Sequence, residues 1–329
     1  MNQDNSLCKP KHKTSIGGQA LIEGLMMIGS ENAAIAIRKP DGEIIVEKRP
    51  TPKKNIFTKI PIIRGAVGLF KQMILGFKAL MYSAEFVDIE EDVSEEDEEN
   101  KEPSKIDKFL EKVFGDKLQD VLIYFSVILS LFFSVGLFML LPNFLSELTL
   151  TRLFAFEEGS KVLIYNVFEG LIRICLFLAY LYFASKLKDI KRVWQYHGSE
   201  HKTIHCYENQ KELTVENIKK YPTAHPRCGT SFLFTVMIVS ILVFSATGRH
   251  DQIIINLLMR IMFLPLVAGI SYEITRFAGR SESKILGIVN APGLLFQKFT
   301  TKEPDESQIE VAIEAMKNVL VEDKKADKW

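Results

Sequence analysis

The stretch that decides the fold is VLIYFSVILSLFFSVGLFMLL, Val121 to Leu141, which carries no charged side chain. A helix needs about 20 predominantly apolar residues to cross the hydrocarbon core of a bilayer. A helix on the surface of a soluble core would keep one polar face toward water, and this stretch has no polar stripe. It therefore predicts a transmembrane helix rather than a helix of a soluble core.

Three further stretches are apolar over a comparable length: residues 162–184, 231–247 and 253–274. Together with the first stretch they predict a mainly α-helical, four-span integral membrane protein.

Charged residues interrupt two of these stretches. Glu169 and Arg173 stand four residues apart in the second stretch, so we expect them to pair along one helix face. Arg260 lies near the middle of the fourth stretch. An unpaired arginine is costly in lipid, so we expect Arg260 to reach Glu169 across the bundle.

The composition of the whole chain limits its partners and its redox state. Hydrophobic residues make up 47% of the chain and charged residues 25%, averages that hide the segregation of the two. Lysine plus arginine equals aspartate plus glutamate, 41 of each, which predicts no nucleic-acid partner. The cysteines show no disulfide framework, so we expect reduced thiols at Cys8, Cys175, Cys206 and Cys228.

The polar N-terminus has no apolar core, so we expect no cleavable signal peptide.

Basic residues near the ends of the apolar stretches predict the orientation. Four of them follow the second stretch closely: Lys186, Lys188, Lys191 and Arg192. The connection after the first stretch is poor in basic residues, and the connection after the third is very short. Because cytoplasmic loops carry the excess of basic residues, residues 185–230 are predicted to face the cytoplasm. Four crossings then place both termini in the cytoplasm of a multi-pass cell-membrane protein.

The N-terminal part of the chain is predicted to consist of three pieces. Residues 1–58 form a polar N-terminus and a small cytoplasmic β-containing piece, in which AAIAIRKPDGEIIVEKRP is typical of a β-hairpin around Asp41-Gly42. Residues 59–87 place basic residues among apolar ones at helical spacing, which indicates an amphipathic or interfacial helix. Residues 88–105 are acidic without apolar periodicity and predict a disordered linker.

The remaining chain is predicted to form a four-span membrane domain, residues 106–290, and C-terminal amphipathic helices, residues 291–329. Asp305 or Ser307 can cap a helix near the C-terminus. The apolar stripe of this helix suits docking and comprises Ile309, Ala312, Met316, Val319 and Leu320.

Histidines cluster in WQYHGSEHKTIHCYE, residues 194–208. His197, His201 and His205 are spaced by four residues, so on a helix they share one face. The string HGSEH matches H-x-x-E-H, in which two imidazoles bind one zinc ion and the glutamate acts as general base. The pattern predicts His197 and His201 as metal ligands and Glu200 as the base. His205 is expected to be a further catalytic or substrate-contacting group.

The sequence does not decide which residues would be the remaining metal ligands. His225 and Cys228 would complete a closed, structural shell, whereas a carboxylate, Glu273 first and Glu23 second, would leave a position for water. Cys228 has a metal-free alternative as a nucleophile with His225 or His205 as its base. The histidines could also serve only as a hydrogen-bonding helix face.

Five blocks of sequence together resemble the YqhQ-like family of uncharacterised bacterial membrane proteins, which are predicted metal-dependent enzymes. The blocks are GGQALIEGLMMIG, YHGSEHKTIHCYE, HPRCGTSF, PLVAGISYEITRFAGR and APGLLFQKFTT. Two positions depart from the family pattern: Ile28 stands where arginine is usual, and Ser199 where alanine is usual. The resemblance implies a membrane protein with a metal site at His197, Glu200, His201, His225 and Cys228.

These patterns predict a zinc-type, metal-dependent membrane enzyme, a hydrolase at the cytoplasmic membrane surface with an unknown substrate. One alternative is a non-catalytic membrane scaffold, in which a structural metal or hydrogen-bonded histidines fix the loop. A second is a channel or transporter that uses the charged residues of the spans. The bilayer is the expected partner, and a homo-oligomer stays open.

Overall fold

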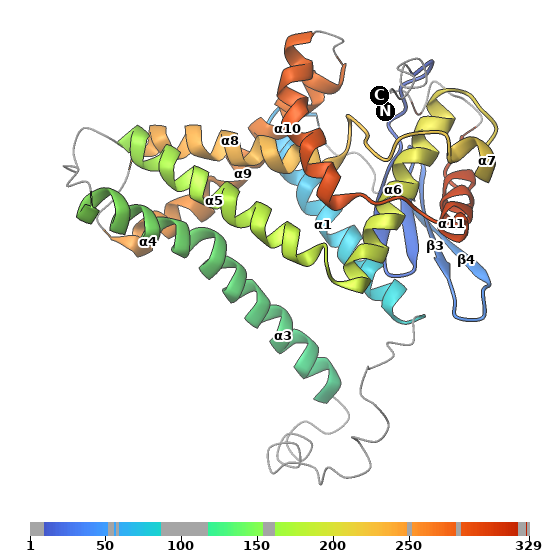
Figure 1. The fold of residues 1–329 in the computed structure, drawn as a ribbon, viewed down its shortest axis with the longest axis horizontal. Helices are drawn as coiled ribbons and strands as arrows, with labels where there is room; N and C mark the ends of the chain where they lie inside the picture. Colours follow the sequence, from blue (N-terminus) through green and yellow to red (C-terminus); the bar gives the residue numbers. More distant parts are fainter. Residues whose placement is uncertain are drawn as a thin grey trace. The chain divides into compact units, whose positions relative to one another are not determined.

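The structure is a computed structural model that describes residues 10–51, 56, 59–86, 118–153, 162–248, 252–280, 284–321 and 327. It is mainly helical, with one antiparallel sheet near the N-terminus (Figure 1). The predicted linker at residues 88–105 lies outside the described residues. The strands are β1 (Gly17–Leu21), β2 (Gly24–Ile28), β3 (Asn32–Arg38) and β4 (Ile44–Pro50).

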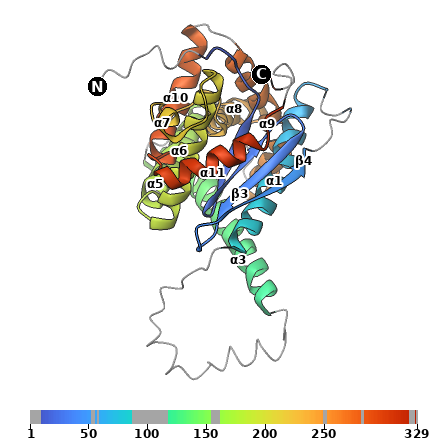
Figure 2. The same cartoon turned by 90° about the vertical axis from the view of Figure 1, so that its right-hand side faces the viewer.

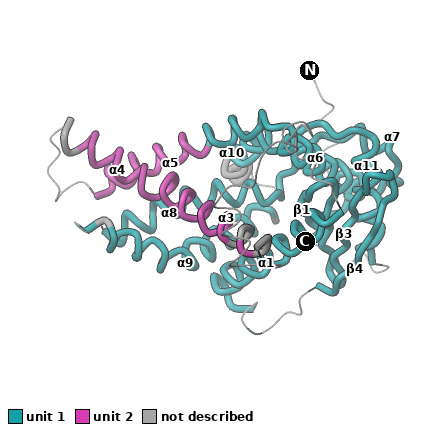
Figure 3. Tube along the Cα trace, turned by 90° about the horizontal axis from the view of Figure 1, so that it is seen from below, with its two compact units in different colours: residues 1–88, 178–329 teal, residues 89–177 magenta. Residues whose placement is uncertain are grey.

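The helices follow the sheet in the sequence. They are α1 (Ile63–Ala84), α3 (Leu118–Val135), the π-helical η4 (Gly136–Leu140), α4 (Leu141–Glu147), the π-helical η5 (Leu148–Leu153), α5 (Val162–Ala184), α6 (Lys188–Glu208), α7 (Val215–Ile218), α8 (Gly229–Thr247), α9 (Ile253–Arg280), α10 (Lys284–Thr300) and α11 (Glu306–Lys317). The chain divides into two compact units, residues 1–88 with 178–329 and residues 89–177 (Figure 3).

The four strands pair in the order β1-β2-β3-β4, each antiparallel to the next. The predicted hairpin at residues 33–50 is confirmed as β3 and β4, with Ile37 opposite Ile45 and a positive φ of 89° at Gly42 in the turn. The preceding apolar stretch, for which no strand was predicted, supplies β1 and β2. Its turn is tight enough to hold Glu23 at a φ of 47°.

Both faces of the sheet are covered by helices (Figures 1 and 2). Side chains alternate across a strand, so Leu25 and Met27 face one side and Met26 the other. The first side packs against Tyr196 and Ile204 of α6 and against α11. The second side packs against α1. This double burial explains the continuous apolar runs of β2 and β3, and it fixes α6 against the sheet.

The C-terminal helix α11 begins as the sequence predicts. Asp305 is its N-cap and forms a capping box with Gln308, in which each side chain accepts from the backbone N–H of the other. Four residues of the predicted stripe are buried: Ile309, Ala312, Met316 and Val319. The expected docking helix is therefore confirmed, and its partner is the sheet.

Among the described residues, four helical stretches are long and apolar enough to cross a membrane, as the sequence predicts. They are Phe125–Leu150, Val162–Ala184, Gly229–Thr247 and Ile254–Gly279. Glu169 and Arg173 form the predicted ion pair at 2.6 Å, and the Arg173 guanidinium also donates to the carbonyl of Phe138. The Arg260 guanidinium lies over the ring of Phe244, 5.6 Å from its centre. The pairing of Arg260 with Glu169 joins residues of the two units and stays a prediction.

Replacing Asp305 by alanine removes the side-chain oxygen that accepts the N–H of Gln308. Losing such an N-cap costs about 1 kcal/mol, so we expect Asp305→Ala to lower the thermal unfolding temperature of the detergent-solubilised protein by a few degrees. Asp305→Asn keeps an acceptor oxygen and should unfold close to the wild type. Equal unfolding temperatures for all three proteins would contradict the role of the cap.

Candidate metal centre

Helix α6 carries the histidine cluster into the interior of its unit. From Gly198 to Cys206 every residue of the helix is buried. A Cβ at Gly198 would overlap the carbonyl oxygen of Lys302, so this glycine lets the segment after α10 lie directly against α6. Lys302 N–H also donates to the carbonyl of Trp194. The histidine face is therefore enclosed rather than displayed on a free helix.

His197, His201 and Cys228 form the first group of metal-ligating side chains. One ligand atom from each lies within 4.8 Å of the others. His197 Nε2 is 3.1 Å from Cys228 Sγ. Zinc bonds of about 2.0–2.1 Å to nitrogen and 2.3 Å to sulfur imply a tetrahedral N-to-S edge of about 3.6 Å. The distance between His197 Nε2 and Cys228 Sγ is thus about half an ångström shorter than in a filled zinc site.

The other ring nitrogen of each histidine is held by a backbone carbonyl. His197 Nδ1 is 2.7 Å from the oxygen of Thr300, and His201 Nδ1 is 2.5 Å from the oxygen of Thr223. A histidine that donates through Nδ1 presents a lone pair at Nε2, as metal-ligating histidines do. His201 Nε2 is buried and has no hydrogen-bond partner.

Cys228 is the N-cap of α8, and its sulfur accepts weakly from Thr230 N–H at 3.5 Å. Burial opposes ionisation, yet the neighbouring His201 and His197 hold the pKa of the Cys228 thiol well below its usual value of 9. Burial likewise opposes a charged His197, but the Cys228 thiolate raises the His197 pKa to about 9. A thiolate is the form in which cysteine binds metals.

Glu200 lies beside this group on α6. Its Oε1 accepts the N–H of Gly18 in β1 at 2.9 Å, whereas Oε2 is buried without a hydrogen-bond partner. Burial raises the Glu200 pKa, an effect that His197 and His201 oppose. A carboxyl group with one free, buried oxygen is suited to receive a proton from a neighbouring group.

His205, Glu208 and His225 form a second group, again with one ligand atom each within 4.8 Å. His205 Nε2 lies 2.9 Å from the carbonyl of Ala224. Burial lowers the pKa of His205 to about 4 and that of His225 well below 6.5, so both imidazoles are neutral. Glu208 binds Arg227 and the N–H of Thr14 through Oε1.

The structure thus brings the predicted residues together in two groups, not one. His197, His201 and Cys228 meet beside Glu200, while His225 and His205 belong to the second group. Glu273 is in neither group among the described residues, because both its oxygens bind Arg64 of α1. The carboxylate of Glu23 binds Arg192 instead.

Sequence reasoning did not assign Glu208 or Gly18. The helical spacing does place Glu208 on or beside the face of the three histidines, but it gives Glu208 no role. Gly18 had no comparable signal, because its role depends on the distant Glu200. A Cβ there would lie 2.7 Å from the Met26 oxygen and 2.9 Å from Glu200 Cδ.

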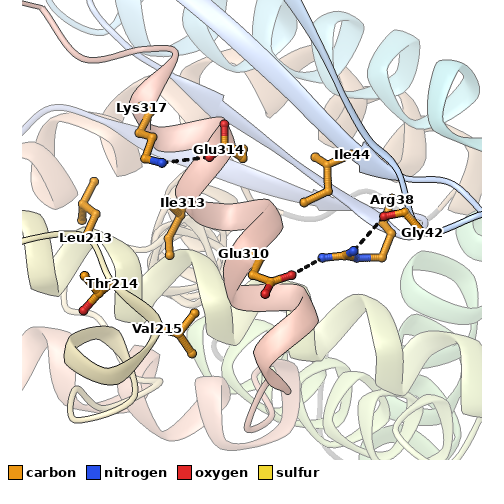
Figure 4. A pocket seen from close by; sticks show the side chains of 10 residues that line it. All are labelled: Arg38, Gly42, Ile44, Leu213, Thr214, Val215, Glu310, Ile313, Glu314 and Lys317. Atoms are coloured by element: carbon orange, nitrogen blue, oxygen red, sulfur yellow. Dashed lines mark hydrogen bonds and ion pairs between the residues drawn. The ribbon is translucent and has the colours of Figure 1, made fainter.

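A shallow groove of about 650 Å³ lies elsewhere on the same unit, between the β3–β4 hairpin, α7 and α11 (Figure 4). Two ion pairs cross or border it, Arg38 with Glu310 and Lys317 with Glu314. Its lining contains no histidine or cysteine. The groove is therefore separate from the metal-ligating groups.

Comparison with known proteins identifies relatives by sequence. The family described as protein of unknown function, DUF1385, matches residues 60–322. A protein of Bacillus subtilis (strain 168) named uncharacterized protein YqhQ is 37% identical over 322 residues, covering 94% of each chain. No solved structure matches the chain. The family resemblance inferred from the motifs is confirmed, whereas the metal site and the enzyme stay predictions.

The contact between Gly18 and Glu200 can be tested with neighbouring glycines. We expect Gly18→Ala to lower the free energy of unfolding by about 1–3 kcal/mol, because the added methyl group overpacks the strand against α6. Gly17→Ala is the control, since nothing lies within 4 Å of a Cβ there. Equal stability of the two variants in thermal unfolding would show that β1 does not press against Glu200.

Proposed function

The chain belongs to the DUF1385 family, and from the geometry of its first group we propose a zinc-type, metal-dependent hydrolase at the cytoplasmic surface of the cell membrane. The observation that carries this proposal is the convergence of His197, His201 and Cys228 on one point. His201 Nε2 and Glu200 Oε2 are both buried there without hydrogen-bond partners. Buried polar atoms are normally satisfied, so two orphaned ones in one cluster favour a bound ion.

The donor set fits zinc. Two imidazoles and a thiolate are its usual ligands, and three protein donors leave a fourth position of the tetrahedron for water or substrate. Among the residues that the structure describes, the first group comprises three ligands, and His225 belongs to the second group. An open position supports catalysis over a purely structural role.

When bound, such an ion polarises a carbonyl or phosphoryl oxygen and makes a water molecule more acidic. The chain's own contribution is then proton transfer and orientation. We assign Glu200 as general base, because one of its oxygens is buried without a hydrogen-bond partner while Gly18 holds the other, and its carboxylate interacts electrostatically with His197 and His201. His205, predicted as catalytic, binds the Ala224 carbonyl in the second group, so it has no part in this step.

The membrane location rests on the four apolar helices and on their basic flanks. Apolar side chains on candidate spans remain exposed, among them Leu242 of α8 and Met262 of α9, and lipid would cover them. Cys228 is the residue that caps α8, the third candidate span. The site is thus at one end of a span, at the depth where the polar part of a lipid or a membrane-bound peptide would lie.

One observation also favours a second candidate, a cysteine nucleophile activated by His197. The 3.1 Å contact between Nε2 and Sγ is the geometry of such a pair. In such a pair His201 would only help to lower the pKa of the Cys228 thiol, whereas a metal ion would also bind its buried, unpartnered Nε2, so the metal hydrolase accounts for more of the cluster. Hydrolysis by a cysteine nucleophile would also persist in the presence of chelators.

The first test of function compares Glu200→Gln with the wild type. We expect both proteins to retain zinc in elemental analysis after purification in detergent. Only the wild type should hydrolyse p-nitrophenyl acetate or bis(p-nitrophenyl) phosphate, with at least a 100-fold loss in the variant, because the amide cannot accept a proton. Glu212→Gln changes an exposed glutamate on the same segment and should match the wild type.

Chelation separates the two candidates. Dipicolinate should abolish the hydrolysis, and added zinc should restore it. Chelator-resistant hydrolysis that is lost in Cys228→Ser would support the nucleophile instead, and a wild-type protein that retains no zinc would contradict the metal hydrolase.

The orientation can be tested by cysteine labelling with an impermeant maleimide, followed by peptide mapping. Lys220→Cys places an exposed thiol between the second and third spans and should react only after cells are permeabilised. Gln252→Cys, between α8 and α9, should react in intact cells. The reverse pattern would place the histidine cluster outside the cytoplasm.

A further inference from the structure

The second group of ligating side chains is more deeply buried than the first. His205, Glu208 and His225 are 5%, 1% and 4% exposed, and they come from α6 and from the segment that precedes α8. No step of the proposed hydrolysis uses them. Burying two histidines and a carboxylate costs free energy, so a compensating interaction is expected in this group.

The hydrogen bonds of each side chain leave one atom that could bind a metal ion without a hydrogen-bond partner. Glu208 Oε1 is occupied by Arg227 and by the Thr14 N–H, which leaves Oε2. His205 donates from Nε2 to the Ala224 carbonyl, so its lone pair is at Nδ1. His225 Nε2 is buried and has no hydrogen-bond partner.

The distance between two of the free atoms matches that between metal ligands. His225 Nε2 lies 3.5 Å from Glu208 Oε2 but without the alignment of a hydrogen bond. Bonds of about 2.0–2.2 Å in tetrahedral geometry give a ligand-to-ligand distance of about 3.3–3.5 Å. Two atoms that sit at this distance without bonding to each other leave room for an ion that binds both.

The charges in the group also suit a cation. Arg227 compensates the Glu208 carboxylate on the Oε1 side, and the His205 imidazole offers a lone pair at Nδ1. One contact competes with an ion: the backbone N–H of Arg227 donates to His225 Nδ1 over 3.3 Å, and a metal at Nε2 requires this hydrogen bond to be given up. That contact would favour a proton on His225 Nε2, and hence a metal-free pair of His225 with Glu208.

We propose that His205, Glu208 and His225 bind a second divalent transition-metal ion beside the first group. Two nitrogens and one oxygen, with no thiolate, suit zinc, manganese or iron, whereas the first group with its sulfur selects zinc-like ions more narrowly. The rings of His201 and His225 are 5.7 Å apart, so the two ions would be neighbours in one centre. The inference rests on residues that the proposed hydrolase does not use.

The test is the metal content of purified, detergent-solubilised protein after loading with zinc and removal of the excess. The wild type should hold two equivalents per chain, and His205→Ala should hold one. Glu216→Gln, which changes an exposed glutamate, should keep two. His205→Ala is preferred to a change of Glu208, which also binds Thr14 and Arg227, and an unchanged thermal unfolding curve in excess chelator shows that the variant folds.

The possible results separate this proposal from the hydrolase. One equivalent in the wild type that survives His205→Ala but is lost in Cys228→Ser overturns the second site alone. One equivalent that is lost in His205→Ala but survives Cys228→Ser supports the second site and overturns the first. A wild type without metal overturns both, and the trio is then a hydrogen-bonded support for the loop.

Discussion

The buried polar side chains on one face of α6 need hydrogen-bond partners, and the rest of this structure depends on this constraint. Helix α6 packs Tyr196 and Ile204 onto the sheet and turns its histidines and Glu200 toward other enclosing segments. Backbone groups from three separate segments each satisfy one atom: Thr300 for His197, Thr223 for His201 and Gly18 for Glu200. Of the atoms that remain, His201 Nε2 and Glu200 Oε2 are buried without hydrogen-bond partners, and His197 and His201 each have a ligand atom within 4.8 Å of Cys228. The helical spacing of the histidines and the burial of their polar atoms therefore together create the site.

This arrangement joins elements that are distant in sequence. The site includes the face of α6, the cap of α8, the end of α10 and the edge strand β1, all within one compact unit. An ion bound by His197 and Cys228 would cross-link α6 to a candidate membrane span. Stability and chemistry would then depend on the same contacts, since a metal that binds only the folded protein stabilises it.

Local patterns in the sequence predicted much of this fold. The candidate spans follow from long apolar runs, the β3–β4 hairpin from its Asp41-Gly42 turn, and the start of α11 from Asp305. The shared face of His197 and His201 follows from their spacing alone. Contacts between residues that are distant in the sequence could not be predicted from local patterns. They are the pairing of Glu273 with Arg64, the separation of His225 from the first group, and the close approach of Gly18 to Glu200. Those outcomes are set by how helices and strands pack, and no local pattern encodes them.

The central claim is that His197, His201 and Cys228 bind a metal ion, and X-ray absorption at the zinc edge tests it most directly. The zinc-loaded protein should show a sulfur neighbour at about 2.3 Å together with nitrogen or oxygen neighbours at about 2.0–2.1 Å. The sulfur contribution should disappear in Cys228→Ser. A wild-type spectrum that nitrogen and oxygen neighbours explain completely would contradict the account, because the zinc would then lie away from Cys228.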